Sequence, residues 1–109
     1  MVIVNVCKKG NEIEEITISG HAESGPAGYD LVCAGVSAVS FGAINAVYRL
    51  ANVKLIIEQR KEGGYLHISF PEGLTQSQWE KAQLQLRSMI VSLQTIEEQY
   101  SDYIQVKIT

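Results

Sequence analysis

A histidine on a glycine-rich segment stands shortly before a cysteine in this chain, and these two residue types can do nucleophilic chemistry together. His21 follows Gly20, and Cys33 follows the run Asp30-Leu31-Val32. A cysteine thiol is in general only a few per cent ionised at neutral pH, so a nucleophilic cysteine needs a nearby base or a positive field. We predict that His21 is the base and Cys33 the nucleophile, if the fold brings them together.

The start of a helix is a second source of activation. Asp30 is a strong N-cap residue, which predicts a helix from Leu31 with Cys33 in its first turn. The field there favours an anion by only about 0.3–1 kcal/mol. One pKa unit corresponds to about 1.4 kcal/mol, so the helix start alone is too weak and a protonated His21 must approach Cys33. The glycines and the proline between the two residues allow the chain to turn back.

Four further residues are candidates for supporting roles. Ser37 lies one helical turn from Cys33, so its hydroxyl would border the same strip of the helix. Asp30 is first of all a helix cap and second a carboxylate that could orient the imidazole. The backbone N–H groups of Ala34 and Gly35 are candidates to hold the oxyanion of an acyl-transfer reaction.

Each of these patterns also has a purely structural interpretation. A cysteine in an apolar helix is commonly a small buried hydrophobe, so the residues alone leave the role of Cys33 open. Ser40, farther along the helix, is expected to be a tolerated position rather than part of a site. Cys7 is expected to be structural and His67 to be a surface or packing residue. A zinc site made from both cysteines and both histidines has no support in their spacing, so we expect no metal or cofactor.

The composition predicts one soluble domain over residues 1–109. With 46% hydrophobic and 19% charged residues the chain is typical of globular proteins. We expect no apolar run of the roughly 18 residues that are needed to span a membrane. The N-terminus lacks a secretory-signal pattern, so we predict a cytoplasmic protein. In the reducing cytoplasm both cysteines should be free thiols. Nine basic against twelve acidic residues give a net charge of −3, which disfavours nucleic acid as a direct ligand.

Hydrophobic periodicity predicts an alternation of strands and helices. Apolar residues at every second position indicate strands, and a spacing of three to four residues indicates amphipathic helices. In chain order we expect a hairpin around residues 2–7 and 13–18, a helix over 30–50, a second hairpin over 53–60 and 65–70, a helix from about 75 to 100, and a strand over 103–108. The order ββαββαβ predicts an α+β fold with both helices packed on a mostly antiparallel sheet.

The residues around His21 and Cys33 also resemble the signature of a known family. Gly20-His21-Ala22, followed by Asp30-Leu31-Val32-Cys33-Ala34-Gly35-Val36-Ser37-Ala38, is similar to the bacterial ribosomal-processing cysteine protease family, Prp. Residues 63–68 and 89–98 resemble the same family, so the likeness extends over nearly the whole chain. The segment 23–29 agrees least with the family, and its glycines would suit a lid that moves when substrate binds.

The resemblance implies an endopeptidase that removes a short N-terminal extension from a large-subunit ribosomal protein near the peptidyl-transferase centre. It further implies that His21 and Cys33 form the catalytic dyad and that the protein is a homodimer. In the mechanism we expect, His21 takes the thiol proton and the Cys33 thiolate forms an acyl-enzyme that water hydrolyses.

Two other functions are compatible with the same residues. One is a non-catalytic, ribosome-associated module that binds a peptide or a protein, where the acidic charge favours protein over RNA. The other is a thiol-dependent transferase, which would differ only in the acceptor that resolves the acyl-enzyme.

Overall fold

The computed structural model describes residues 1–21 and 26–109, with the backbone alone described over residues 26–30. Its elements are the strands β1 (Val2–Lys9), β2 (Glu12–Ser19), β3 (Ile56–Gln59), β4 (Tyr65–Ser69) and β5 (Ile104–Ile108), and the helices α1 (Pro26–Ala51) and α2 (Gln76–Gln99). The order ββαββαβ confirms the prediction from periodicity.

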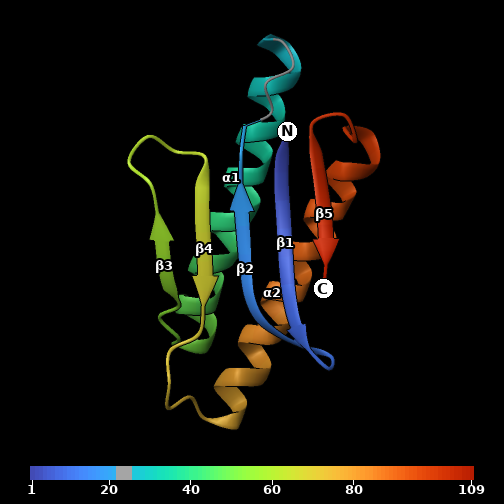
Figure 1. Ribbon diagram of the computed structural model, residues 1–109. Coiled ribbons are helices and arrows are strands. Elements are labelled where there is room, and N and C mark those ends of the chain that lie inside the picture. The colour runs from blue at the N-terminus through green and yellow to red at the C-terminus, as the bar shows by residue number, and fades with distance from the viewer. Residues whose placement is uncertain (22–25) are drawn as a thin grey trace.

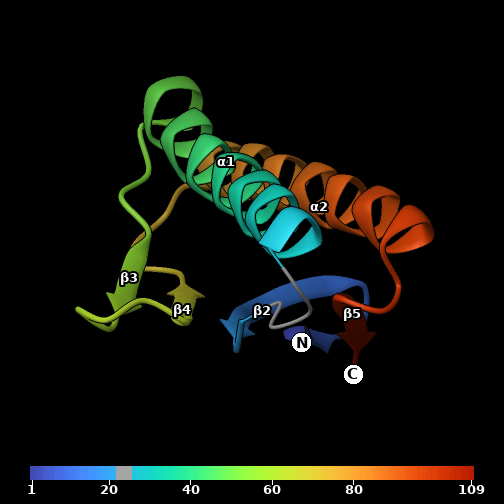
Figure 2. The same cartoon turned by 90° about the horizontal axis from the view of Figure 1, so that it is seen from above.

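The five strands form one sheet in the order β3-β4-β2-β1-β5 (Figure 1). The pairs β1–β2, β2–β4 and β3–β4 are antiparallel, whereas β1 and β5 run parallel. Both helices lie on the same face of this sheet (Figure 2). The molecule is therefore the two-layer α+β fold that the sequence predicts.

The core lies between the helices and the inner face of the sheet. It is made of apolar side chains from both layers, including Val4, Val6, Ile13, Ile16, Val47, Leu86, Leu93 and Ile104. One buried polar side chain, Gln83 of α2, accepts a hydrogen bond from the Ile13 N–H at 2.9 Å and donates one to the Ile13 carbonyl at 2.8 Å. Thr75 caps α2 through a capping box with Gln78, which confirms the predicted start of that helix.

Helix α1 starts earlier than the sequence predicts. Its first residue is Pro26, so Asp30 lies inside the helix and the prediction that Asp30 is the N-cap is wrong. Proline suits the first helical position because its fixed φ is helical and its missing N–H would have no partner there. Of the predicted lid over 23–29, residues 26–29 are therefore helical, while residues 22–25 lie outside the described part of the chain.

Helix α1 is also more apolar than expected. The stretch Leu31–Ala51 has a mean hydropathy of 1.7 and is long and apolar enough, by length and composition alone, to cross a membrane. The expectation that no run reaches this length is wrong. Core helices of soluble proteins pass the same test, and here Val32, Val36 and Val47 of α1 are buried in the core. Tyr48, in contrast, is exposed, so α1 carries apolar side chains on its outer face as well.

Candidate active site

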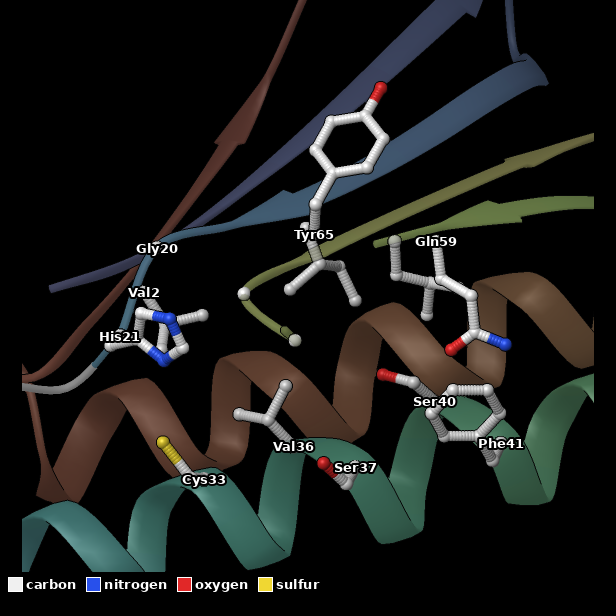
Figure 3. A pocket seen from close by; sticks show the side chains of 14 residues that line it. Val2, Gly20, His21, Cys33, Val36, Ser37, Ser40, Phe41, Gln59 and Tyr65 are labelled. Atoms are coloured by element: carbon white, nitrogen blue, oxygen red, sulfur yellow. The ribbon is translucent and has the colours of Figure 1, made fainter. Parts of the chain in front are cut away.

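A pocket of about 240 Å³ opens between α1 and the hairpin formed by β3 and β4. His21 and Cys33 line one end of this pocket, and Ser40, Phe41 and Gln59 line the other (Figure 3). Its walls thus come from the end of β2, from α1 and from the hairpin, which are distant in the sequence. A peptide that enters the pocket can contact all of them.

His21 and Cys33 reach the pocket from opposite walls. His21 follows directly after β2, and Cys33 is a residue of α1. Figure 3 shows the imidazole ring and the thiol at the same end of the pocket. Both side chains are half-buried, so they are partly shielded from water and still open to the pocket. The fold therefore brings together the two residues whose types suit nucleophilic chemistry.

Backbone contacts at two glycines hold His21. The Gly20 N–H donates a hydrogen bond of 2.9 Å to the Gly64 carbonyl, and the Met1 nitrogen donates one to the His21 carbonyl. Gly64 has φ +76, and a Cβ on it would lie only 2.9 Å from Cε1 of His21 and would overlap Nε2 as well. The imidazole therefore rests against bare backbone at Gly64, where any side chain would displace it.

Cys33 lies roughly two turns beyond the start of α1. The field of a helix terminus falls off within its first turn. The predicted activation of Cys33 by the helix start is therefore wrong, because that prediction depended on a helix that begins after Asp30. Among the described side chains at this end of the pocket, His21 is the one suited to accept the thiol proton.

The structure places the four candidate supporting residues in different surroundings. Ser37 is exposed and lines the pocket. Ala34 is exposed on α1, and a Cβ on Gly35 would lie 3.5 Å from Cδ1 of Ile96, so Gly35 faces α2. The N–H groups of both residues lie inside the helix, where they serve its own hydrogen bonds, which removes the basis for the predicted oxyanion site. The Asp30 side chain lies outside the described residues.

The sequence did not identify three residues of this pocket as functional. Ser40, expected to be a tolerated helix position, lines the pocket and is buried. Gly64 lies between the two strands of the predicted second hairpin, and Gln59 is predicted only as part of a strand. The pairing of Ser19 with Tyr65 carries Gly64 to the end of β2 beside His21. Such long-range pairing has no signal in a single sequence.

Cys7 and His67 lie on the opposite, helix-free face of the sheet. Their strand neighbours Val6 and Leu66 are buried toward the helices, and side chains alternate along a strand. His67 approaches Glu15 there, with 3.4 Å between Nε2 and the carboxylate. The two cysteines and two histidines therefore do not converge on one metal site. Within residues 1–21 and 26–109, no three His, Cys, Asp or Glu side chains are grouped in a way that could hold a metal ion.

Comparison with known proteins matches this chain to one family over most of its length. Residues 1–105 match the sequence model of the family described as cysteine protease Prp. The chain is 48% identical over 89 residues to the ribosomal processing cysteine protease Prp of Bacillus subtilis, which covers 82% of this chain and 80% of the relative.

Solved structures show the same likeness. An essential ribosomal processing protease Prp from S. aureus, in complex with a covalently linked product peptide, superposes with a TM-score of 0.86 at 36% identity, with both chains fully covered. The S. aureus protein in complex with a substrate peptide superposes with a TM-score of 0.85 at 35% identity, again with both chains fully covered. With these matches and a pocket that joins the motifs around His21 and Cys33, this chain belongs to the Prp family of ribosomal processing cysteine proteases.

Proposed function

We propose that this protein is a cytoplasmic endopeptidase that removes a short N-terminal extension from a large-subunit ribosomal protein during ribosome assembly. The observation that carries the proposal is the placement of the His21 and Cys33 side chains at one end of an open, mainly apolar pocket. The names of the similar proteins, which are ribosomal processing proteases, support the choice of substrate. The net charge of −3 favours a protein over a nucleic acid as the partner.

The proposed reaction uses His21 and Cys33 as a dyad. His21 accepts the thiol proton of Cys33, and the thiolate attacks the carbonyl carbon of the scissile bond. The C–N bond then breaks, the leaving amine takes the proton from His21, and a thioester remains on Cys33. Water next attacks the thioester while His21 accepts its proton, which releases the carboxylate product and restores the thiol. This hydrolysis requires no oxidant, reductant or cofactor.

Two features support such a covalent route. The imidazole of His21 is fixed against Gly64, so the base requires little reorganisation before proton transfer. The S. aureus relative was solved with a covalently linked product peptide, which supports a covalent step in this chain as well. Ser37 lines the pocket one helical turn from Cys33 and is a candidate to orient the imidazole.

A junction peptide tests the proposed substrate. We expect the wild-type protein to cut a synthetic peptide that spans the extension junction at a single bond, read by mass spectrometry. A peptide of the same composition in scrambled order is the control and should stay intact. Cleavage of both peptides at similar rates, or cleavage only outside the junction, would refute the proposed specificity.

We further propose that the protein is a homodimer that uses the outer face of α1. Leu31 and Tyr48 are each 57% exposed and lie on the side of the helix that faces away from the core. Apolar patches exposed on a soluble protein commonly mark protein interfaces. We expect light scattering to give the dimer mass for the wild type and the monomer mass for Tyr48→Glu. Leu84→Glu, at a 60% exposed position of α2, is the matched control and should stay dimeric.

A monomeric wild type across the concentration range would contradict the dimer. A Tyr48→Glu variant that stays dimeric would instead move the interface away from α1.

A further inference from the structure

The end of the pocket far from His21 contains a buried hydroxyl group without a hydrogen-bond partner in the described part of the chain. Ser40 of α1 is 1% exposed, and its Oγ has no hydrogen-bond partner among the described residues. An unpaired buried polar group costs stability, and such groups in native proteins usually have a functional or structural cause. Ser40 lines the pocket, and Figure 3 shows its hydroxyl pointing into it. The unsatisfied group therefore faces a space that a ligand can fill.

The opposite wall places a second polar group near this hydroxyl. Gln59, at the end of β3, is exposed, and its side-chain amide extends toward Ser40 in Figure 3. A carboxamide offers both a donor and an acceptor, and a hydroxyl does the same. Together the two residues can satisfy a ligand group of either kind.

The remaining surface at this end is apolar and uncharged. Val36, Phe41 and Leu66 contribute the apolar part of the lining. Among the described residues that line the pocket there is no Asp, Glu, Lys or Arg. A charged ligand group placed here would lose its water without gaining a countercharge, which is unfavourable. This end of the pocket therefore suits a neutral group with a hydrogen-bonding tip on an apolar stem.

Helix geometry sets the distance between this end and the reacting thiol. Ser40 follows Cys33 on α1, and a rise of 1.5 Å per residue puts their Cα atoms roughly 10 Å apart along the axis. An extended peptide advances about 3.3 Å per residue. A substrate bonded at Cys33 would thus place at Ser40 the side chain about three residues from the scissile bond.

We propose that Ser40 and Gln59 form a specificity subsite for a neutral substrate side chain bearing a hydroxyl or carboxamide, about three residues from the scissile bond. The proposal rests on the proposed function, because it needs a peptide held at Cys33. In the complex, the substrate group supplies the hydrogen-bond partner that the described residues do not offer to the Ser40 hydroxyl. Ser40 then determines which peptides are cut and takes no part in bond cleavage.

The Ser40→Ala variant is well suited to test this, because it removes an unsatisfied group. Deletion of a buried hydroxyl without a partner should leave the Tm of the free protein unchanged or raised. A loss of selectivity in this variant therefore cannot come from loss of the fold. Ser88→Ala, at an exposed position of α2, is the matched control for the same substitution within a helix.

The experiment measures kcat/KM for junction peptides that carry Gln, Ser, Leu or Lys three positions from the cleaved bond, on each side in turn. On one side of the cleaved bond, the kcat/KM of the wild type and of Ser88→Ala should be at least about tenfold higher for the Gln or Ser peptide than for the Leu and Lys peptides. This is the factor that corresponds to one well-placed hydrogen bond. Ser40→Ala should lose this preference and leave the Leu peptide unaffected. Gln59→Glu should gain cleavage of the Lys peptide, because it adds a negative charge to the subsite.

The outcomes separate the two proposals. If the wild type cuts none of the peptides, the proposed function fails. If the wild type cuts them but Ser40→Ala keeps the wild-type preference, the subsite is wrong. An equal fall for all four peptides in Ser40→Ala also overturns it, since that result would mean that Ser40 supports the shape of the site and does not select substrates.

Discussion

Replacement of Cys33 by alanine is expected to lower kcat/KM for the junction peptide by at least about 10³-fold, and His21→Ala should have an effect of similar size. The cysteine supplies the nucleophile and the histidine supplies its base, so the covalent route is lost in either variant. The double variant should be no slower than the single ones, because residues that act as one unit are strongly non-additive. Single-turnover rates from quantitative mass spectrometry measure all three.

The other cysteine provides a control in the same molecule. Cys7 is free and half-buried like Cys33, but it lies on the opposite face of the sheet from the pocket. Cys7→Ala should keep wild-type activity, and iodoacetamide should alkylate Cys33 faster than Cys7. This difference in rate should shrink in His21→Ala, which lacks the base. Independent, multiplicative effects of the Cys33 and His21 variants would show that the two residues do not work as a dyad.

Gly64→Ala is expected to lower kcat/KM by roughly 10- to 100-fold without unfolding the protein, since a small displacement of a catalytic group can cost this much. An alanine Cβ would overlap the His21 ring, so the imidazole must move away from its present position. The measurement is the rate of cleavage together with the rate of Cys33 alkylation, which should fall in parallel if the histidine activates the thiol.

A variant at the neighbouring Gly63 distinguishes the effect of the contact with His21 from the effect of backbone strain. Gly63 has φ +79, close to the +76 of Gly64, and a Cβ on it would meet nothing within 4 Å. Both alanine variants therefore suffer the same penalty for a left-handed conformation, and only one of them displaces His21. If Gly63→Ala loses as much activity as Gly64→Ala, the effect comes from the strained turn and not from the contact with the imidazole.

The two-layer fold could be predicted from the sequence because each element carries a strong local pattern. The alternation of Val2, Val4 and Val6 marks a half-buried strand, and Thr75 with Gln78 marks the start of α2. The start of α1 was missed because two start signals compete within a few residues. Asp30 is a good cap, but Pro26 is a good first residue, and the helix uses the proline.

The details of the site depended on contacts between distant parts of the chain. His21 and Cys33 were identified through their types and the motifs around them. The positions of the other pocket residues, in contrast, follow from the pairing of β2 with β4 and from the packing of α1 over the hairpin of β3 and β4. A glycine in a turn and a serine in a helix have many uses. Only the assembled fold shows that Gly64 lies against His21 and that Ser40 is buried without a partner among residues 1–21 and 26–109.

The pairing of β1 with β5 makes one wall of the pocket depend on a strand that is remote in the sequence. Val2 lines the pocket, its N–H bonds to the Tyr103 carbonyl at 2.8 Å, and it pairs with Ile104 in β5. Contacts between residues this far apart in the chain form late and slowly during folding. One wall of the pocket therefore lacks its support until β5 has joined the sheet. A change that detaches β5 from β1 should therefore loosen the pocket wall at Val2, far from His21 and Cys33 in the sequence.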